Sequence, residues 1–386
     1  MTAIKTKLED HEGADSDGPP KVKQPKYLQI VESLRSGIAE GKYRDGSRLP
    51  SEAELVRRFD VSRMTVVKAM QQLRQEGLLV RRTGSGTYAA ESGKPHNPVF
   101  GLMIPDLGDT DIFEPICKGM ARSPGLSGHS LSWGHSLATG ASKEEDIEHL
   151  CQQYIDQKVS GVFFAPVEFS SHRDQVNRRI LKSLHLAHIP VVLLDRCILK
   201  YPERSEYDVV SLDNRRAGYV VADHLIRQGA QHIAFLARAD SAETVDDRIT
   251  GYREALFTHG LNLSNRLLLR GDGSDASSIE SFLKRNKVDA IQCGNDITAA
   301  QLMRTLLGMG VRVPEDIRIA GVDDVKYGSL LPVPLTTFHQ PCSDIGAAAV
   351  AAMKERIGNP QLPGRSILLN GRLVVRKSCG AGTANG

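Results

Sequence analysis

The chain has 386 residues, of which 40% are hydrophobic and 25% charged, the composition of an ordinary globular protein. No apolar run reaches the roughly 18–20 residues of a membrane span, and the first twenty residues lack the apolar core of a signal peptide, so we expect a cytoplasmic protein with no membrane partner. The formal net charge is +3, but residues 21–90 carry +7 and residues 1–20 carry −3, which indicates that a small basic head meets a polyanion.

Motifs for catalysis or metal binding are missing from the sequence. The six cysteines form no CxxC pair and the twelve histidines no HExxH motif, so we expect no disulfide framework and no metal site. There is no G-x-S-x-G motif, no P-loop, and no G-x-G-x-x-G between a strand and a helix. We therefore expect neither a cofactor nor an enzymatic activity.

The N-terminal quarter of the chain contains a predicted tail and a predicted head. Residues 1–24 are polar and aperiodic, which predicts a disordered tail. Residues 25–90 form a compact basic block, and apolar residues at helical spacing predict its first helix over 27–41.

Two further helices in this block have clear start signals. Ser51 and Glu54 form a capping box before the helix 52–59, and Ser62 caps the helix 63–76 after a turn at 60–61. Two helices joined by so short a turn predict a helix-turn-helix unit, whose second helix reads base edges from its N-terminal residues. Arg63 there offers a donor fork that suits guanine or a pair of phosphates. Val66, Ala69, Met70 and Leu73 are expected to face the core of the head.

Residues 78–88 predict a β-hairpin wing, because two short strands flank the glycine-rich turn Gly84-Ser85-Gly86. With its capped helices, the segment GKYRDGSRLPSEAELVRRFDVSRMTVVKAMQQLRQEGLLVRRTGSGTYA resembles the winged helix-turn-helix head of the GntR family. The resemblance covers the whole head and implies that double-stranded DNA is a partner. The expected DNA contacts are Ser51, Glu52, Ser62, Arg63, Thr65, Lys68, Arg81, Arg82, Thr83, Gly84 and Gly86. Some family members carry arginine at the positions of Ala53 and Val67, so their sequence preference does not transfer.

Residues 91–98 are rich in Pro, Gly and Asn and predict a linker, after which the body spans 98–380. Short apolar runs predict strands at 99–104, 159–166, 189–195, 208–213, 232–237, 265–270, 290–294, 317–323 and 366–375. Helices are expected at 144–157, 214–229, 246–260, 296–310 and 345–358. This alternation predicts an α/β domain with parallel sheets.

Polar side chains gather where the predicted strands end, which is where open parallel sheets place their ligands. The body resembles the effector domain of the lac/gal repressors and the type I periplasmic sugar-binding proteins, most strongly in IRIAGVDDVKYGSLLPVPLTTFHQ (317–340). The resemblance implies two lobes, a small sugar-like effector in the cleft between them, and a periplasmic-binding-protein-like fold. The expected effector contacts are Asp106, Phe113, Glu168, Asp195, Arg196, Arg248, Asn295, Asp296, Asp323 and Gln340. Asp111 and Phe169 are expected to complete the cleft, with Phe113 or Phe169 stacking on a sugar ring.

The lobes are expected to take 98–208 with 341–358 and 209–340 with 359–380, so the chain would cross near 208, 340 and 360. Together these features predict a homodimeric, sequence-specific transcription regulator, most simply a repressor released by its effector. Three alternatives stay open: a solute-binding protein for transport, a sensor of a corepressor such as a purine, and a catalytic body.

Overall fold

The computed structural model describes residues 25–44, 46–75, 78–82, 85–89, 99–105, 111–134, 142–262 and 264–381. The chain divides into two compact units, Met1–His96 and Asn97–Gly386. The predicted tail at 1–24 and linker at 91–98 lie outside the described residues. Within the described residues, no helix combines the length and the apolar character that crossing a bilayer requires.

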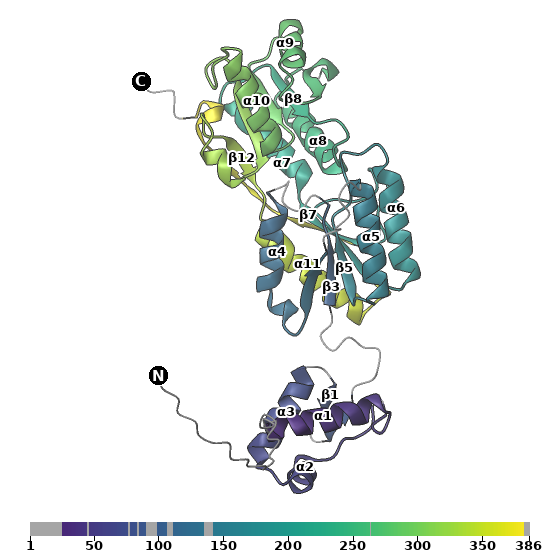
Figure 1. Cartoon of the computed structure of the whole chain (residues 1–386). Coiled ribbons are helices and arrows are strands. Elements are labelled where there is room, and N and C mark those ends of the chain that lie inside the picture. The colour runs from purple at the N-terminus through teal and green to yellow at the C-terminus, as the bar shows by residue number, and fades with distance from the viewer. Residues whose placement is uncertain are drawn as a thin grey trace, which may run out of the picture. The chain divides into compact units, whose positions relative to one another are not determined.

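The head contains the three predicted helices and the predicted hairpin (Figure 1). The helices are α1 (Lys26–Ala39), α2 (Glu52–Phe59) and α3 (Arg63–Gln75), and the strands are β1 (Leu79–Arg82) and β2 (Gly86–Ala89). The two strands pair antiparallel, with Arg82 opposite Gly86. The predicted core face of α3 is confirmed, because its four members are all buried: Val66, Ala69, Met70 and Leu73.

The first lobe of the body is a six-stranded sheet in the order β13-β7-β6-β5-β3-β4, parallel at every pairing. Its strands are β3 (Val99–Met103), β4 (Ser130–Trp133), β5 (Gly161–Phe164), β6 (Val191–Leu194), β7 (Asp208–Leu212) and β13 (Ser366–Leu369). Its helices are α4 (Phe113–Arg122), α5 (Lys143–Asp156), α6 (Arg173–Leu186) and α11 (Cys342–Gly358). Phe163 packs in a core with α4 and α11, whereas its neighbours Val162 and Phe164 pack with α5 and α6, so helices cover both faces.

The second lobe repeats this three-layer plan with the strand order β14-β12-β11-β10-β8-β9. Its strands are β8 (Ile233–Ala237), β9 (Leu268–Arg270), β10 (Ala290–Cys293), β11 (Arg318–Asp323), β12 (Thr336–His339) and β14 (Arg372–Val374), of which only β14 runs antiparallel to its neighbour. Its helices are α7 (Asn214–Arg227), α8 (Glu243–Thr258), α9 (Ala276–Arg285) and α10 (Asp296–Gly308). Phe235 packs with α7 and α8, and Leu236 packs with α9 and α10.

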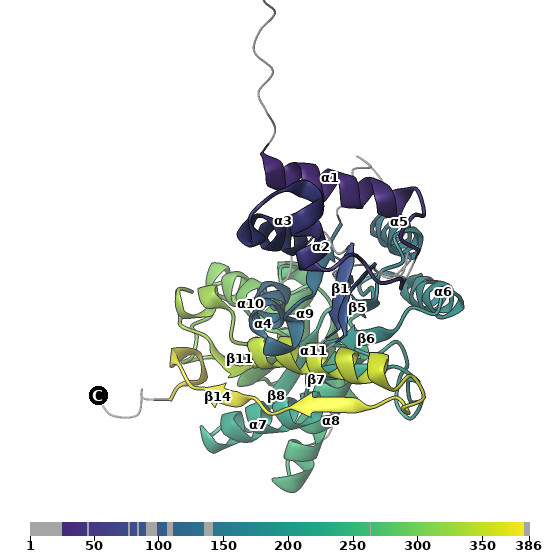
Figure 2. The same ribbon diagram turned by 90° about the horizontal axis from the view of Figure 1, so that it is seen from below.

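The predicted lobe boundaries are wrong at two of the three crossings. Strand β7 belongs to the sheet of the first lobe, so the first crossing follows Leu212 and not 208. The run 366–375, predicted as one strand, is two strands in different sheets, so the last crossing lies between β13 and β14 and not near 360. Figure 2 shows this yellow C-terminal segment passing from α11 to β14. The middle crossing lies at Gln340, as predicted, between β12 and α11.

Candidate DNA interface and effector site

Side-chain caps fix the starts of both helices of the helix-turn-helix unit, α2 and α3. Ser51 Oγ accepts a hydrogen bond from the backbone N–H of Glu54, whose carboxylate accepts in return from the backbone N–H of Ser51. Ser62 Oγ accepts from the backbone N–H of Thr65 at 3.2 Å and lies 2.8 Å from its hydroxyl. These contacts fix the turn between the helices and present the first turn of α3 to solvent.

The predicted DNA-contacting side chains differ in exposure and in their contacts within the head. The side chain of Arg63 is 80% exposed, with its Nε 3.3 Å from Glu52, so the two predicted contacts touch each other across the turn. Lys68 lies over the ring of Tyr27, 4.1 Å from its centroid, which turns its ammonium toward α1. In the wing, Arg81 is exposed, and Gly86 has a φ of +123°, a conformation that favours glycine. Thr83, Gly84 and the side chain of Arg82 lie outside the described residues.

A cavity of about 140 Å³ lies between the two lobes of the body. Six of the ten predicted effector residues line it: Glu168, Asp195, Arg196, Arg248, Asn295 and Asp323. The predicted cleft residues Asp111 and Phe169 also line it, as do Lys143, Arg238, Thr244, Gln301 and Tyr327, which the sequence analysis did not single out. Asp106 lies outside the described residues.

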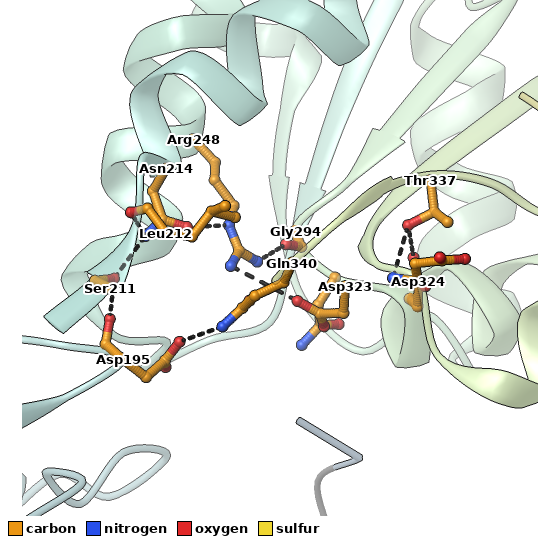
Figure 3. A network of polar contacts seen from close by, with 12 residues as sticks. Asp195, Ser211, Leu212, Asn214, Arg248, Gly294, Asp323, Asp324, Thr337 and Gln340 are labelled. Carbon is orange, nitrogen blue, oxygen red and sulfur yellow. Dashed lines mark hydrogen bonds and ion pairs between the residues drawn. The ribbon is translucent and has the colours of Figure 1, made fainter. Parts of the chain in front are cut away.

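Arg248 is the best-anchored side chain of this cavity (Figure 3). Its Nε donates to Asn214 Oδ1 at 2.8 Å, one terminal nitrogen donates to the carbonyl of Gly294, and the other lies 3.8 Å from Asp323 Oδ1. Arg248 was grouped with residues at strand ends, although it also falls in the predicted helix 246–260, and it does lie inside a helix, α8. Close packing of α7 against α8 holds it there. The two helices approach so closely that a Cβ on Gly218 of α7 would lie 2.0 Å from the carbonyl oxygen of Arg248. The absence of that Cβ brings α8 close enough for Arg248 to reach the cleft.

Asp195 and Gln340 join the two lobes at the floor of the cleft. Asp195 follows β6 directly and accepts from Gln340 Nε2 at 3.1 Å (Figure 3). Gln340 is 1% exposed, and its Oε1 has no hydrogen-bond partner among the described residues. A buried acceptor without a donor is costly, so this oxygen suits a donor supplied by a ligand.

Arg196 and Glu168 form an ion pair inside the first lobe. The guanidinium of Arg196 contacts Glu168 Oε1, and its Nε lies 3.2 Å from Asp195. The Arg196 side chain is 5% exposed, so its charge is balanced by the two carboxylates and not by water. The pair fixes acidic acceptors along the wall of the cavity.

The two acidic residues of the second lobe that were predicted as effector contacts, Asp323 and Asp296, differ in their roles. Asp323 ends β11 and lines the cavity, and burial raises the pKa of its carboxyl well above the usual range even though Arg248 opposes that shift. Asp296 was predicted as a ligand contact, but it is fully buried and accepts from Thr337 Oγ1 at 2.6 Å and from the backbone N–H of Val325 at 3.1 Å. Burial raises the pKa of Asp296 to about 7. It therefore anchors the loop after Asp323 and does not line the cavity.

The aromatic predictions need a similar correction. Phe113 is 1% exposed within the core under α4 and α11, with the guanidinium carbon of Arg196 5.5 Å from its ring centroid, so it is not available for stacking on a ligand. Phe169 does line the cavity, but Arg238 lies over its ring at 4.1 Å. Asn295 lines the cavity and also caps α10 by accepting from the backbone N–H of Thr298. Gln340 lines a neighbouring hollow of about 220 Å³ that shares Asp111 and Asp323 with the first cavity.

Direct contacts hold the two lobes together beside the cavity. The backbone N–H of Phe169 donates to the carbonyl of Asp240 at 3.0 Å, and the guanidinium of Arg173 donates to the same carbonyl. Glu243, at the start of α8, accepts from the backbone N–H of Cys197 in the first lobe. Burial raises the pKa of Glu243 to about 8. The lobes are thus closed on each other at this edge of the cleft.

Of the lining residues that the sequence analysis missed, Thr244, Gln301 and Tyr327 lacked a clear sequence signal, whereas Arg238 had one. Arg238 follows β8 directly, so the rule that ligands gather at strand ends was available to identify it. Thr244 and Gln301 face the cavity from inside helices, and Tyr327 lies in a short 3-10 turn (Lys326–Ser329). Residues in helices and turns come to line the same cavity only through tertiary packing, which a local sequence pattern does not contain.

Comparison with known proteins agrees with this division. Residues 26–89 match the bacterial regulatory proteins of the gntR family, and residues 222–379 match the periplasmic binding protein-like domain. The arabinose metabolism transcriptional repressor of Geobacillus stearothermophilus is 29% identical over 367 residues, covering 92% of this chain and 97% of that protein. The chain is a transcription regulator whose head matches the gntR family model.

Two further comparisons concern a curated repressor and a solved structure. The transcriptional repressor PurR of Photobacterium profundum is 31% identical over 194 residues, 49% of this chain and 57% of that protein. The solved complex of the transcriptional regulator CelR with cellobiose has a TM-score of 0.61 at 24% identity, covering 82% of this chain and 91% of that one, which supports the fold. These relatives are regulators and not enzymes, in agreement with the sequence analysis.

Proposed function

We propose that this regulator is a homodimeric repressor. It releases its operator when a neutral monosaccharide binds between the two lobes of the body. The head supplies DNA recognition, and Arg63 and the wing residues around Gly86 are the proposed contacts. Because a DNA-binding regulator must meet its operator inside the cell, we also propose that it acts in the cytoplasm.

The observation that carries the proposal is the set of side chains around the cavity of about 140 Å³. The cavity is small and lined by side chains of both lobes, which suits a small polar ligand. The carboxyl groups of Asp195 and Asp323 offer acceptor oxygens, Arg248 donates, and Asn295 does both. Such a mixed set suits the hydroxyls of a polyol, each of which both donates and accepts.

A purine corepressor is the second candidate, since one relative is named PurR. A flat aromatic ligand is best held by an open aromatic face. Here Phe113 lies in the core and Phe169 is covered by Arg238, so of the aromatic side chains near the cavity only Tyr327 is left to face a ligand, among the described residues. The polar and charged side chains that make up most of the named lining favour a sugar.

Dimerisation is proposed because a palindromic operator is read by two heads. The second lobe offers an apolar surface for it. Two exposed apolar residues of α10, Ile297 (44% exposed) and Leu307 (36%), line a shallow apolar hollow together with Leu331. A molar mass of one chain by light scattering, at the concentrations that occupy the operator, would contradict the dimer.

A ligand panel tests the effector. A ligand bound only by the native state raises the melting temperature, so monosaccharides, disaccharides, purine bases and nucleosides are compared by thermal shift on the full chain. We expect at least one monosaccharide to stabilise the protein and to release a bound operator duplex in a mobility-shift experiment. Stabilisation by purines alone would establish the second candidate in its place.

A further inference from the structure

Met64 is the most exposed large apolar residue in the described part of the helix-turn-helix unit. It is the second residue of α3, and its side chain is 74% exposed. The buried face of α3 is formed by Val66, Ala69, Met70 and Leu73. At about 100° per residue, Met64 points almost directly away from that face. It therefore projects outward from the end of α3 that meets DNA.

The polar neighbours of Met64 have contacts within the head. The hydroxyl of Thr65 lies 2.8 Å from Ser62 Oγ, and the ammonium of Lys68 lies over Tyr27. Arg63 is exposed beside Met64 and lies within 3.3 Å of Glu52. Arg63 and Met64 are thus the two side chains that reach farthest from the first turn of α3, one charged and one apolar.

We propose that Met64 reads a thymine, by packing its thioether on the C5-methyl group of that base in each operator half-site. This inference rests on the proposed function, because it requires α3 to enter the major groove. The thymine methyl is the apolar group that base pairs present there, and apolar side chains distinguish thymine by contacting it. Methionine suits this role, since its flexible, polarisable side chain adapts to a convex methyl surface.

Deoxyuridine gives a direct test, because it pairs as thymidine does and lacks only the methyl group. Operator duplexes are first recovered by selection from random DNA with the full chain, and each thymidine of the half-site is then replaced by deoxyuridine. We expect one position at which the replacement weakens binding by about fourfold, the effect of one buried methyl group. Met64→Ala should bind thymidine and deoxyuridine duplexes equally at that position.

Two further variants separate base reading from general weakening. Met64→Leu keeps an apolar contact and should retain the preference for thymidine. Leu186→Ala removes a side chain that is 69% exposed on α6, far from the head in sequence, and should leave the preference unchanged. Melting curves confirm that each variant is folded.

The outcomes are distinct. Sequence-specific binding in which no deoxyuridine replacement matters, or in which the same replacement weakens the parent and Met64→Ala equally, would overturn the role of Met64 while leaving the proposed function intact. If the chain selects no sequence at all from random DNA, the proposed function fails and Met64 has no base to read.

Discussion

Arg248 connects three structural elements at the cleft through single hydrogen bonds and one longer ionic contact. It reaches Asn214 at the start of α7, Gly294 after β10 and Asp323 at the end of β11. An arginine held on three sides keeps its fork in one orientation, which suits recognition of adjacent hydroxyls. The proposed sugar therefore depends on Arg248 for orientation and not only for charge.

Replacing Arg248 should remove effector binding and leave the head intact. Hydrogen bonds to charged groups contribute about 1.5–3 kcal/mol each, so Arg248→Ala should lower the affinity for the sugar by at least about tenfold. The loss is measured as a smaller or absent thermal shift on adding sugar. Operator affinity without sugar should equal that of the parent. Arg253→Ala, which alters an exposed arginine on the same helix, is the matched control. An unchanged thermal shift in Arg248→Ala would remove this residue from the site.

Single residues also show where sequence analysis stops. Asp195 and Asp323 were identified because they follow strand ends, and both line the cavity. Asp296 fits the same rule, yet its side chain turns inward to Thr337. Phe113 follows the first predicted strand of the body, as a cleft residue would, but its side chain packs into the core. The direction in which a side chain turns at a strand end depends on its neighbours in space, which the sequence does not display.

Among the elements, β7 is tied to the rest of the first lobe by a buried carboxylate. Asp208, fully buried at its start, pairs with Arg356 of α11 at 2.8 Å and with Arg365, just before β13, at 2.9 Å. Burial alone would raise the pKa of Asp208, but hydrogen bonds from the two arginines lower it below its usual value. These bonds hold the returning C-terminal segment against the first lobe.

Asp208→Asn should destabilise the body by about 3–5 kcal/mol, the cost of removing one partner of a buried ion pair. Because the pKa of Asp208 is lower in the folded state, its contribution is present above the unfolded pKa of about 3.9 and is lost as pH falls through the folded value. Chemical denaturation at neutral pH measures the cost. Asp316→Asn breaks an exposed pair with Arg312 and should leave the midpoint nearly unchanged. Equal midpoints for both variants would contradict this role.

The elements of the head were predicted more accurately than those of the body, for a physical reason. The caps at Ser51 and Ser62 are contacts between residues three apart, so their sequence pattern contains the whole interaction. The boundary between the lobes is different. The apolar run 366–375 reads as one strand, and only its pairing with β7 on one side and β12 on the other divides it.

For the whole molecule, closure of the body depends on burying Glu243 between the lobes. Its carboxylate accepts from the backbone of Cys197, and burial raises its pKa to about 8. In an open body this carboxyl would be solvated, with a pKa near its ordinary value. Closure therefore takes up a proton, and the closed state is favoured at low pH.

Sugar affinity should fall as pH rises between about 4.5 and 8, by at most about tenfold per pH unit for a single linked proton. Glu243→Gln keeps an acceptor for Cys197 without the charge, so it should bind sugar with a flatter pH profile and with higher affinity at pH 8. Calorimetric titrations across this range measure both effects. A profile as steep as that of the parent would assign the proton to another group, such as Asp323.

The central claim is that a sugar in the cleft of the body controls the hold of the head on DNA. Coupling of this kind requires that the ligand interact differently with the operator-bound and free states. The most direct measurement titrates the stabilising monosaccharide into the preformed complex of full chain and operator, followed by fluorescence anisotropy of labelled DNA, for the parent and for Arg248→Ala. We predict that the parent releases the operator with a midpoint near its sugar dissociation constant, while Arg248→Ala remains bound at the same concentrations. A parent complex that stays intact while its cleft is saturated with sugar would contradict the account.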